Sequence, residues 1–140
     1  MFIRMFLLML AVAALPAQAE TFHQGDLEVV VNAIPATELT AQASESYNVT
    51  REAGRGLLTI AVNRTQGSKT IAVPAQIYAG ALNQNNNLIN IPVRELRDQS
   101  GVHYLGEFRL NGSNALTFLV NVNVLGKLVK AEFSRLFPAQ

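Results

Sequence analysis

Hydrophobic and polar residues alternate along most of the chain after residue 26. Such a pattern lets every second side chain face a buried core, which is typical of β-strands with one face in water. The repeat predicts about seven short strands separated by residues that favour turns. They are expected near residues 27–33, 58–62, 71–78, 89–94, 102–110, 116–124 and 129–135. Short strands at this spacing predict an antiparallel two-layer sandwich of immunoglobulin-like type.

Turn and proline positions refine this expectation. Pro74 and Pro92 fall inside two of the expected strands. Because proline has no N–H to give to a neighbouring strand, we expect these strands to lie at a sheet edge or to carry a bulge. Asn111-Gly112 separates two further strands and supplies the positive φ angles of a tight hairpin. Among the inward positions we expect core residues at Ile60, Phe108, Phe118 and Val120.

One segment near residues 38–47 has a helical spacing instead. Leu39, Ala43 and Tyr47 are four residues apart and therefore share one helical face. Thr37 or Thr40 can cap the start. We expect one short helix here, lying across an open end of the sandwich.

The N-terminus has the form of an export signal. Arg4 precedes an apolar run of 11 residues, which is shorter than the roughly 20 that a membrane-spanning helix needs. Ala17-Gln18-Ala19 then offers a small-x-small cleavage site. We expect cleavage between Ala19 and Glu20, so that residues 1–19 are a signal peptide and residues 20–140 form one domain with no membrane span.

Composition excludes several kinds of function. The chain has 11 Lys and Arg against 10 Asp and Glu, and these charges are scattered without a basic stripe for nucleic acid. It has no cysteine, which excludes disulfides and thiolate catalysis.

The residues able to carry chemistry do not form a known pattern. His23 and His103 lack metal-ligand spacing, so we expect no metal and no cofactor. Ser100 is close to His103 in sequence, but it lies in a stretch of turn composition. Acids such as Glu95 and Glu107 are scattered, as on an ordinary soluble surface.

Tyr47 and Arg51 are the remaining candidates for a site. They are four residues apart at the exit of the expected helix. In the structural interpretation Tyr47 packs on the sandwich, and Arg51 bonds to carbonyls or to an acid such as Glu45 or Glu52. In the functional one they bind a small anion or a peptide, since arginine offers a bidentate fork and tyrosine a flat contact.

The order of several short motifs resembles a known family. They are Asn32-Ala33-Ile34, Tyr47-Asn48-Val49-Thr50-Arg51, the run at 56–62, Tyr104-Leu105-Gly106-Glu107-Phe108-Arg109-Leu110, and Phe133 with Phe137. Over roughly residues 23–138 the chain is similar to the domain of unknown function 4426 family, whose members are short exported bacterial proteins. The resemblance implies an exported β-sandwich in the periplasm and implies no activity.

These observations favour a non-enzymatic binding or protein-interaction module of the periplasm, with an unknown protein or small ligand as partner. Two alternatives remain open. The first is a carrier that holds a small apolar ligand between the sheets, which requires an apolar cavity. The second is a hydrolase with an unrecognised site, which requires a concave pocket that gathers titratable groups.

Overall fold

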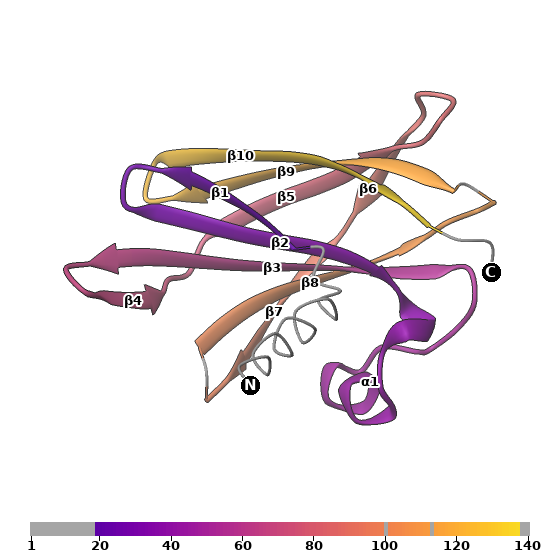
Figure 1. The fold of residues 1–140 in the computed structure, drawn as a ribbon, viewed down its shortest axis with the longest axis horizontal. Coiled ribbons are helices and arrows are strands. Elements are labelled where there is room, and N and C mark those ends of the chain that lie inside the picture. Colours follow the sequence, from indigo (N-terminus) through magenta and orange to yellow (C-terminus); the bar gives the residue numbers. More distant parts are fainter. Residues whose placement is uncertain (1–18, 100, 113, 138–140) are drawn as a thin grey trace, which may run out of the picture.

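The computed structural model describes residues 19–99, 101–112 and 114–137, which form two packed antiparallel sheets and one α-helix (Figure 1). Sheet A contains β1 (Glu20–Gln24), β2 (Leu27–Pro35), β3 (Arg55–Gln66), β4 (Lys69–Ala72), β7 (Val93–Asp98) and β8 (Gly101–Arg109). Sheet B contains β5 (Gln76–Leu82), β6 (Leu88–Ile91), β9 (Ala115–Val124) and β10 (Lys127–Leu136). The expected antiparallel two-layer sandwich is confirmed, with ten strands in the described residues where the pattern predicts about seven.

The outer strands of the two sheets lie next to each other at one side of the sandwich. Sheet A has the order β1-β2-β3-β8-β7, with β4 paired to β3, and sheet B has the order β10-β9-β5-β6. The outer strand β1 of sheet A lies along the outer strand β10 of sheet B (Figure 1). The sequence pattern does not predict β1, because most of its side chains are exposed and it pairs with β2 through its backbone.

Pro74 and Pro92 mark two of the three places where the chain crosses from one sheet to the other, the third being the connection from β8 to β9. β4 belongs to sheet A and β5 to sheet B, and Pro74 lies between them. Pro92 likewise separates β6 of sheet B from β7 of sheet A. The prediction of single strands over residues 71–78 and 89–94 is therefore wrong. A residue without an N–H is tolerated here because the chain leaves one ladder before it joins the other.

The side chain of Tyr104 supports the first of these crossings. Tyr104 is a buried residue of β8, and its hydroxyl oxygen accepts a hydrogen bond of 2.9 Å from the backbone N–H of Ala75. Ala75 follows Pro74 and lies outside both neighbouring strands. The tyrosine hydroxyl therefore accepts the hydrogen bond that a neighbouring strand would accept from this N–H inside a sheet.

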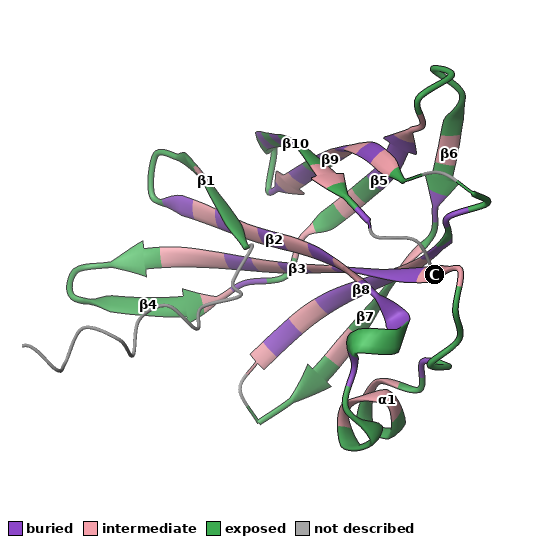
Figure 2. Ribbon diagram, turned by 45° about the vertical axis from the view of Figure 1, so that its right-hand side comes forward, coloured by how far each residue is buried: buried purple, intermediate pink, exposed green. Residues whose placement is uncertain are grey.

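The core between the sheets follows the predicted alternation, with inward residues buried and outward residues more exposed (Figure 2). All four residues expected in the core are buried: Ile60, Phe108, Phe118 and Val120. At one end the rings of Phe118, Phe108, Phe133 and Phe137 lie in contact, with centroids 5.0 to 6.3 Å apart. Gly56 is paired with Phe108 across the sheet, and a Cβ there would lie 2.2 Å from the ring. This end of the interior is therefore filled by aromatic rings.

The helix covers the outer face of sheet A, and the prediction that it lies across an open end of the sandwich is wrong. After a 3-10 turn (Ala36–Glu38), α1 (Ala41–Tyr47) packs through Ala43 and Tyr47 on outward residues of the sheet, among them Leu57 and Leu105. Leu57 and Leu105 alternate with inward neighbours, so they belong to a second, smaller core. In the described part of the chain, no helix has the length and apolar character that crossing a membrane requires.

Candidate functional site

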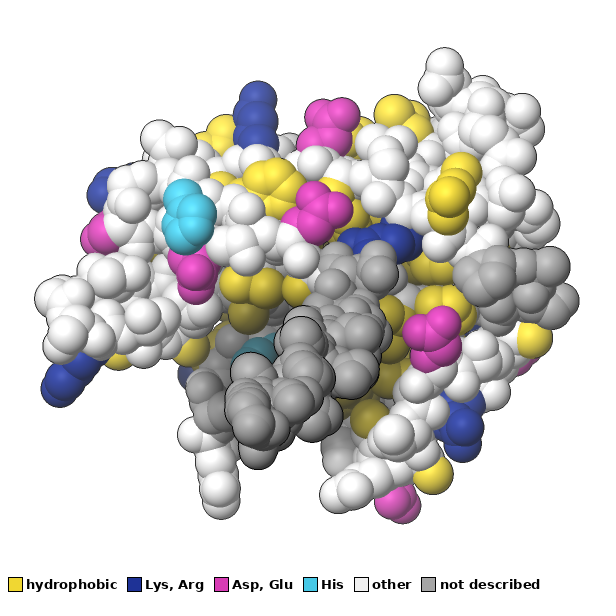
Figure 3. All heavy atoms as spheres, in the orientation of Figure 1, with side chains coloured by type: hydrophobic (Ala, Val, Ile, Leu, Met, Phe, Trp, Pro, Cys, Tyr) yellow, Lys and Arg dark blue, Asp and Glu magenta, His cyan; other side chains and the backbone are white. Residues whose placement is uncertain are grey.

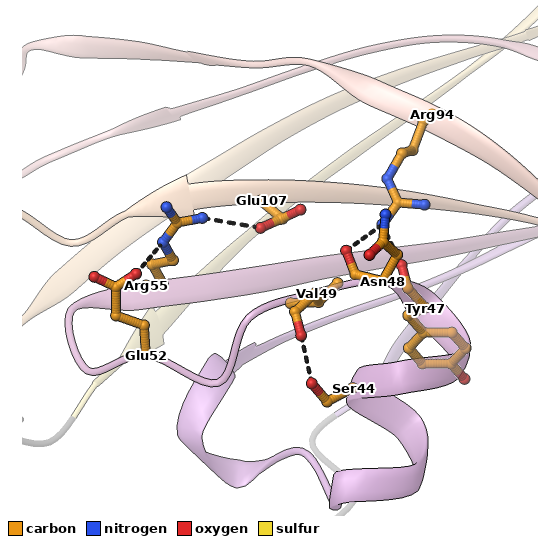
Figure 4. Close-up of polar contacts among 8 residues, drawn as sticks. All are labelled: Ser44, Tyr47, Asn48, Val49, Glu52, Arg55, Arg94 and Glu107. Atoms are coloured by element: carbon orange, nitrogen blue, oxygen red, sulfur yellow. Dashed lines mark hydrogen bonds and ion pairs between the residues drawn. The ribbon is translucent and has the colours of Figure 1, made fainter.

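Side-chain hydrogen bonds stabilise α1 at both of its ends, and those at its C-terminal end come from sheet A. Thr40 caps α1, since its hydroxyl oxygen accepts a hydrogen bond of 3.0 Å from the N–H of Ala43. At the other end Arg94 of β7 donates to the backbone carbonyls of Tyr47 and Asn48 (Figure 4). A seven-residue helix is marginal alone, so these contacts and the second core hold it in place.

Arg55 joins the loop between α1 and β3 to the sheet. Its Nε lies 2.9 Å from a carboxylate oxygen of Glu52, and its Nη1 donates to Glu107 at 3.1 Å (Figure 4). All three side chains are partly exposed. Glu107, expected as one of the scattered surface acids, takes part in a bridge between the loop and β8.

A shallow groove of about 560 Å³ runs along the far side of α1 from the sheet. Its lining residues are Ala41, Ser44, Glu45, Asn48, Val49, Thr50 and Arg51. Arg51 is exposed at this groove, and no hydrogen bond or ion pair joins it to another residue that the structure describes. The structural bonds expected of Arg51 are made instead by Arg94 and Arg55.

Tyr47 and Arg51 do not form a joint site. Tyr47 is half-buried on the face of α1 that packs against the sheet, whereas Arg51 lines the groove on the opposite side. The groove is lined by both Glu45 and Arg51. Its serine, Ser44, already donates its hydroxyl to the carbonyl of Val49 (Figure 4). The arrangement can bind a small polar group and offers no paired nucleophile and base.

The other chemical candidates are dispersed. His103 lies 3.7 Å from Asp98 on the β7–β8 hairpin, and Glu95 forms an ion pair of 2.7 Å with Arg97. His23 is exposed on β1, while Ser100 and the expected signal residues 1–18 lie outside the described residues. No group of three His, Cys, Asp or Glu side chains that could hold a metal ion occurs in the described ranges.

The most distinctive surface is the outer face of sheet B. Its outward positions carry large hydrophobic side chains that are exposed: Tyr78 is 71% exposed, Leu88 66%, Leu128 46% and Leu136 77%. Among the outward residues of these four strands, all of which are described, only Lys130 and Glu132 are charged. Figure 3 shows hydrophobic side chains along the upper margin, over β10, with one basic and one acidic side chain between them.

The outer face of sheet A has the opposite character. It carries charged or titratable side chains on β2, β3, β7 and β8, namely Glu28, Arg55, Arg94, His103, Glu107 and Arg109. Two sheets of the same fold thus differ in the side chains that they show to water. Depletion of charge combined with exposed tyrosine and leucine is the composition of a protein–protein interface.

Sequence reasoning misses this surface, although part of the signal is present. The outward positions of residues 116–124 are Thr117, Leu119, Asn121 and Asn123, a strand face without charge. The other three strands of the face could be added only after the pairing of β9 with β5 and β10 was known.

Comparison with known proteins identifies the family. The family model described as a domain of unknown function (DUF4426) matches residues 21–138. A crystal structure of a DUF4426 family protein from Pseudomonas aeruginosa PAO1 is similar, with a TM-score of 0.70 and 18% sequence identity over 87% of this chain and 97% of that chain. No curated protein matches. The structural likeness at this identity shows the shared fold, and the family match covers most of the chain, so the chain belongs to the DUF4426 family.

Proposed function

We propose that the mature protein is a non-enzymatic interaction module of the periplasm that binds another protein through the outer face of sheet B. The observation that carries this proposal is the exposed, nearly uncharged surface of that face. A sheet that only faced water would show polar and charged side chains at its outward positions. Here Tyr78, Leu88 and Leu136 occupy such positions while most of their surface remains in water.

Export to the periplasm is supported by the N-terminal sequence. An apolar run ends before Ala17-Gln18-Ala19, and the first strand of the fold begins at Glu20. Cleavage after Ala19 would therefore release the domain without removing any part of β1.

The two alternatives receive less support. The aromatic rings of Phe108, Phe118, Phe133 and Phe137 fill one end of the space in which a carrier would hold its ligand. The groove beside α1 gathers Glu45 and Arg51, but its serine hydroxyl is bonded to a carbonyl.

Photo-crosslinking in living cells tests the proposal. A photoreactive amino acid replaces Tyr78 on the outer face of sheet B or, as the control, the exposed Thr65 on the outer side of β3. We expect irradiation to give a discrete larger product from position 78 and none from position 65. Equal labelling at both positions, or no product from position 78, would contradict the proposed function.

A further inference from the structure

The outer face of sheet B is complementary to itself. We propose that its occupant is a second copy of this chain, packed face to face about a two-fold axis. This inference rests on the proposed function, because it names the partner of the same surface. The reasons are the arrangement of charge, the arrangement of apolar side chains and the size of the face.

The strand register defines the axis. Ala131, Val120 and Ala79 are direct partners across β10, β9 and β5, and their side chains point into the core. They therefore form one straight line across the sheet. We place a two-fold axis parallel to this line, just above the outer face of the sheet. Rotation about it reverses the direction of every strand and lays each strand over its own counterpart in the second copy.

Charge is complementary about this axis. Lys130 and Glu132 lie one residue on either side of Ala131, and both point outward from β10. The rotation places Lys130 over Glu132 of the second copy and Glu132 over its Lys130. The only two charges at the outward positions of these four strands thus form two ion pairs.

Apolar side chains meet as well. Tyr78 and Gly80 flank Ala79 on β5, so the exposed ring of Tyr78 lies over Gly80 of the second copy. A Cβ at Gly80 would lie 3.3 Å from a methyl carbon of Leu88, so the ring meets the exposed Leu88 side chain there. On β10 the same rotation carries Leu128 over Ser134 of the second copy. Ser134 lines a hollow of about 200 Å³, whose other lining residues include Leu82, Leu116 and Leu136 as well as the polar Gln84 and Arg135.

The area suits a weak, reversible dimer. The strands β9, β10, β5 and β6 have 10, 10, 7 and 4 residues. At about 3.3 Å per residue and about 4.8 Å between strands, they give a face of roughly 500 Å² per copy. Two copies then bury roughly 1,000 Å², which is the size of weak and transient interfaces. We therefore expect monomer and dimer in exchange, with the dimer populated at high concentration.

Charge reversal tests both the partner and the axis. Sedimentation velocity on mature protein up to about 1 mM should show a dimer. Lys130→Glu alone and Glu132→Lys alone place like charges opposite each other, so each should weaken self-association by about tenfold or more. The double variant restores both ion pairs and should dimerise again. An equimolar mixture of the two single variants should form a mixed dimer. Lys69→Glu on β4 of sheet A is the matched control and should leave self-association unchanged.

The outcomes separate this inference from the proposed function. Native protein that stays monomeric at 1 mM, or single reversals that dimerise like the native chain, would overturn the second copy as the occupant. A crosslink from position 78 to a different protein would then leave the proposed function intact. A native dimer whose double variant does not recover, and whose single variants do not associate when mixed, would overturn the two-fold axis through Ala131, Val120 and Ala79.

Discussion

Leu125 occupies a backbone conformation that suits other residues better. It lies at the tip of the β9–β10 hairpin with φ 50°, and it is 91% exposed. The other non-glycine residues with positive φ in the described chain are all asparagines: Asn48, Asn86 and Asn111. The left-handed region costs a typical side chain about 1–2 kcal/mol, and Leu125 recovers none of this by burial.

Replacing Leu125 by Asn should therefore stabilise the fold. Asparagine tolerates the left-handed region and forms local hydrogen bonds there, so the free energy of unfolding should rise by about 0.5–1 kcal/mol. Urea denaturation at low protein concentration measures this. Leu125→Ala keeps the strain and should change stability by less than about 0.5 kcal/mol. A loss of stability in Leu125→Asn would show that the leucine makes a contact that offsets its strain.

Arg51 and Arg55 have different environments, which a pair of alanine variants can compare. Arg55→Ala removes the bridge between Glu52 and Glu107 and should lower the free energy of unfolding by about 1 kcal/mol, a small value because the side chains are partly exposed. Arg51→Ala removes an exposed side chain of the groove and should change it by less than about 0.5 kcal/mol. Thermal melts of both variants measure the two changes in stability. If Arg51→Ala is the more damaging change, Arg51 has a structural role.

At the scale of elements, two of the three crossings between sheets depend on residues that are distant in sequence. The crossing at Pro74 is supported by Tyr104 of β8, and the crossing at Pro92 by Gly106 of the same strand. A Cβ at Gly106 would lie 2.6 Å from a methyl carbon of Ile91, so only glycine lets the chain pass so close to β8 as it crosses from β6 to β7. β8 thus shapes both of these crossings.

Tyr104→Phe tests the first crossing. The change leaves the ring in place and removes the acceptor of the Ala75 N–H, so it should lower the free energy of unfolding by about 1–2 kcal/mol. Denaturation of the purified variant provides the measurement. Tyr78→Phe removes the hydroxyl of an exposed tyrosine and serves as the control, with an expected change below about 0.5 kcal/mol. Equal stability of Tyr104→Phe and the native chain would mean that this hydrogen bond does not support the crossing.

At the scale of the whole molecule, the aromatic cluster holds the sheets together. Phe118 is fully buried on β9, and its ring contacts those of Phe108 from sheet A, Phe133 from the neighbouring strand β10, and Phe137 that follows β10. Phe118→Ala should cost roughly 3–5 kcal/mol of stability, since it removes a buried ring from between the sheets. Phe118→Leu keeps most of the apolar volume and should cost clearly less. A loss below about 1 kcal/mol for the alanine variant would contradict the packing described here.

Processing of the full chain is the second prediction at this scale. We expect the exported protein to begin at Glu20, the first residue of β1, because Ala17-Gln18-Ala19 meets the requirements of signal peptidase. Mass spectrometry of protein released from the periplasm gives the N-terminus directly. Protein that retains Met1 there would refute the cleavage site, and Ala19→Asp should slow processing.

The sequence by itself determined the local properties of this protein. Alternation identified the core positions Ile60, Phe108, Phe118 and Val120. The four-residue spacing identified a short helix, but α1 begins at Ala41 and not near residue 38, and of the two expected caps Thr40 is the one that caps it. Asn111 and Gly112 both adopt the positive φ angles expected of them, but the expected tight hairpin is wrong, because these residues connect β8 of sheet A to β9 of sheet B. The correctly predicted features depend on neighbours within a few residues, so local chemistry is sufficient to predict them.

Only the tertiary structure decided which local features lie side by side. Alternation continues through Pro74 and Pro92 in the sequence, so it could not show that the chain changes sheets there. Arg51 and Arg55 are only four residues apart in the sequence, yet it is Arg55 that forms the ion pair with Glu107. The outer face of sheet B combines outward residues of β5, β6, β9 and β10, which lie between residues 76 and 136. The nearly uncharged surface forms only when those four strands pair in register, and the same is true of the line of residues that lies between Lys130 and Glu132. Long-range backbone hydrogen bonds make that pairing, and no local pattern in the sequence specifies it.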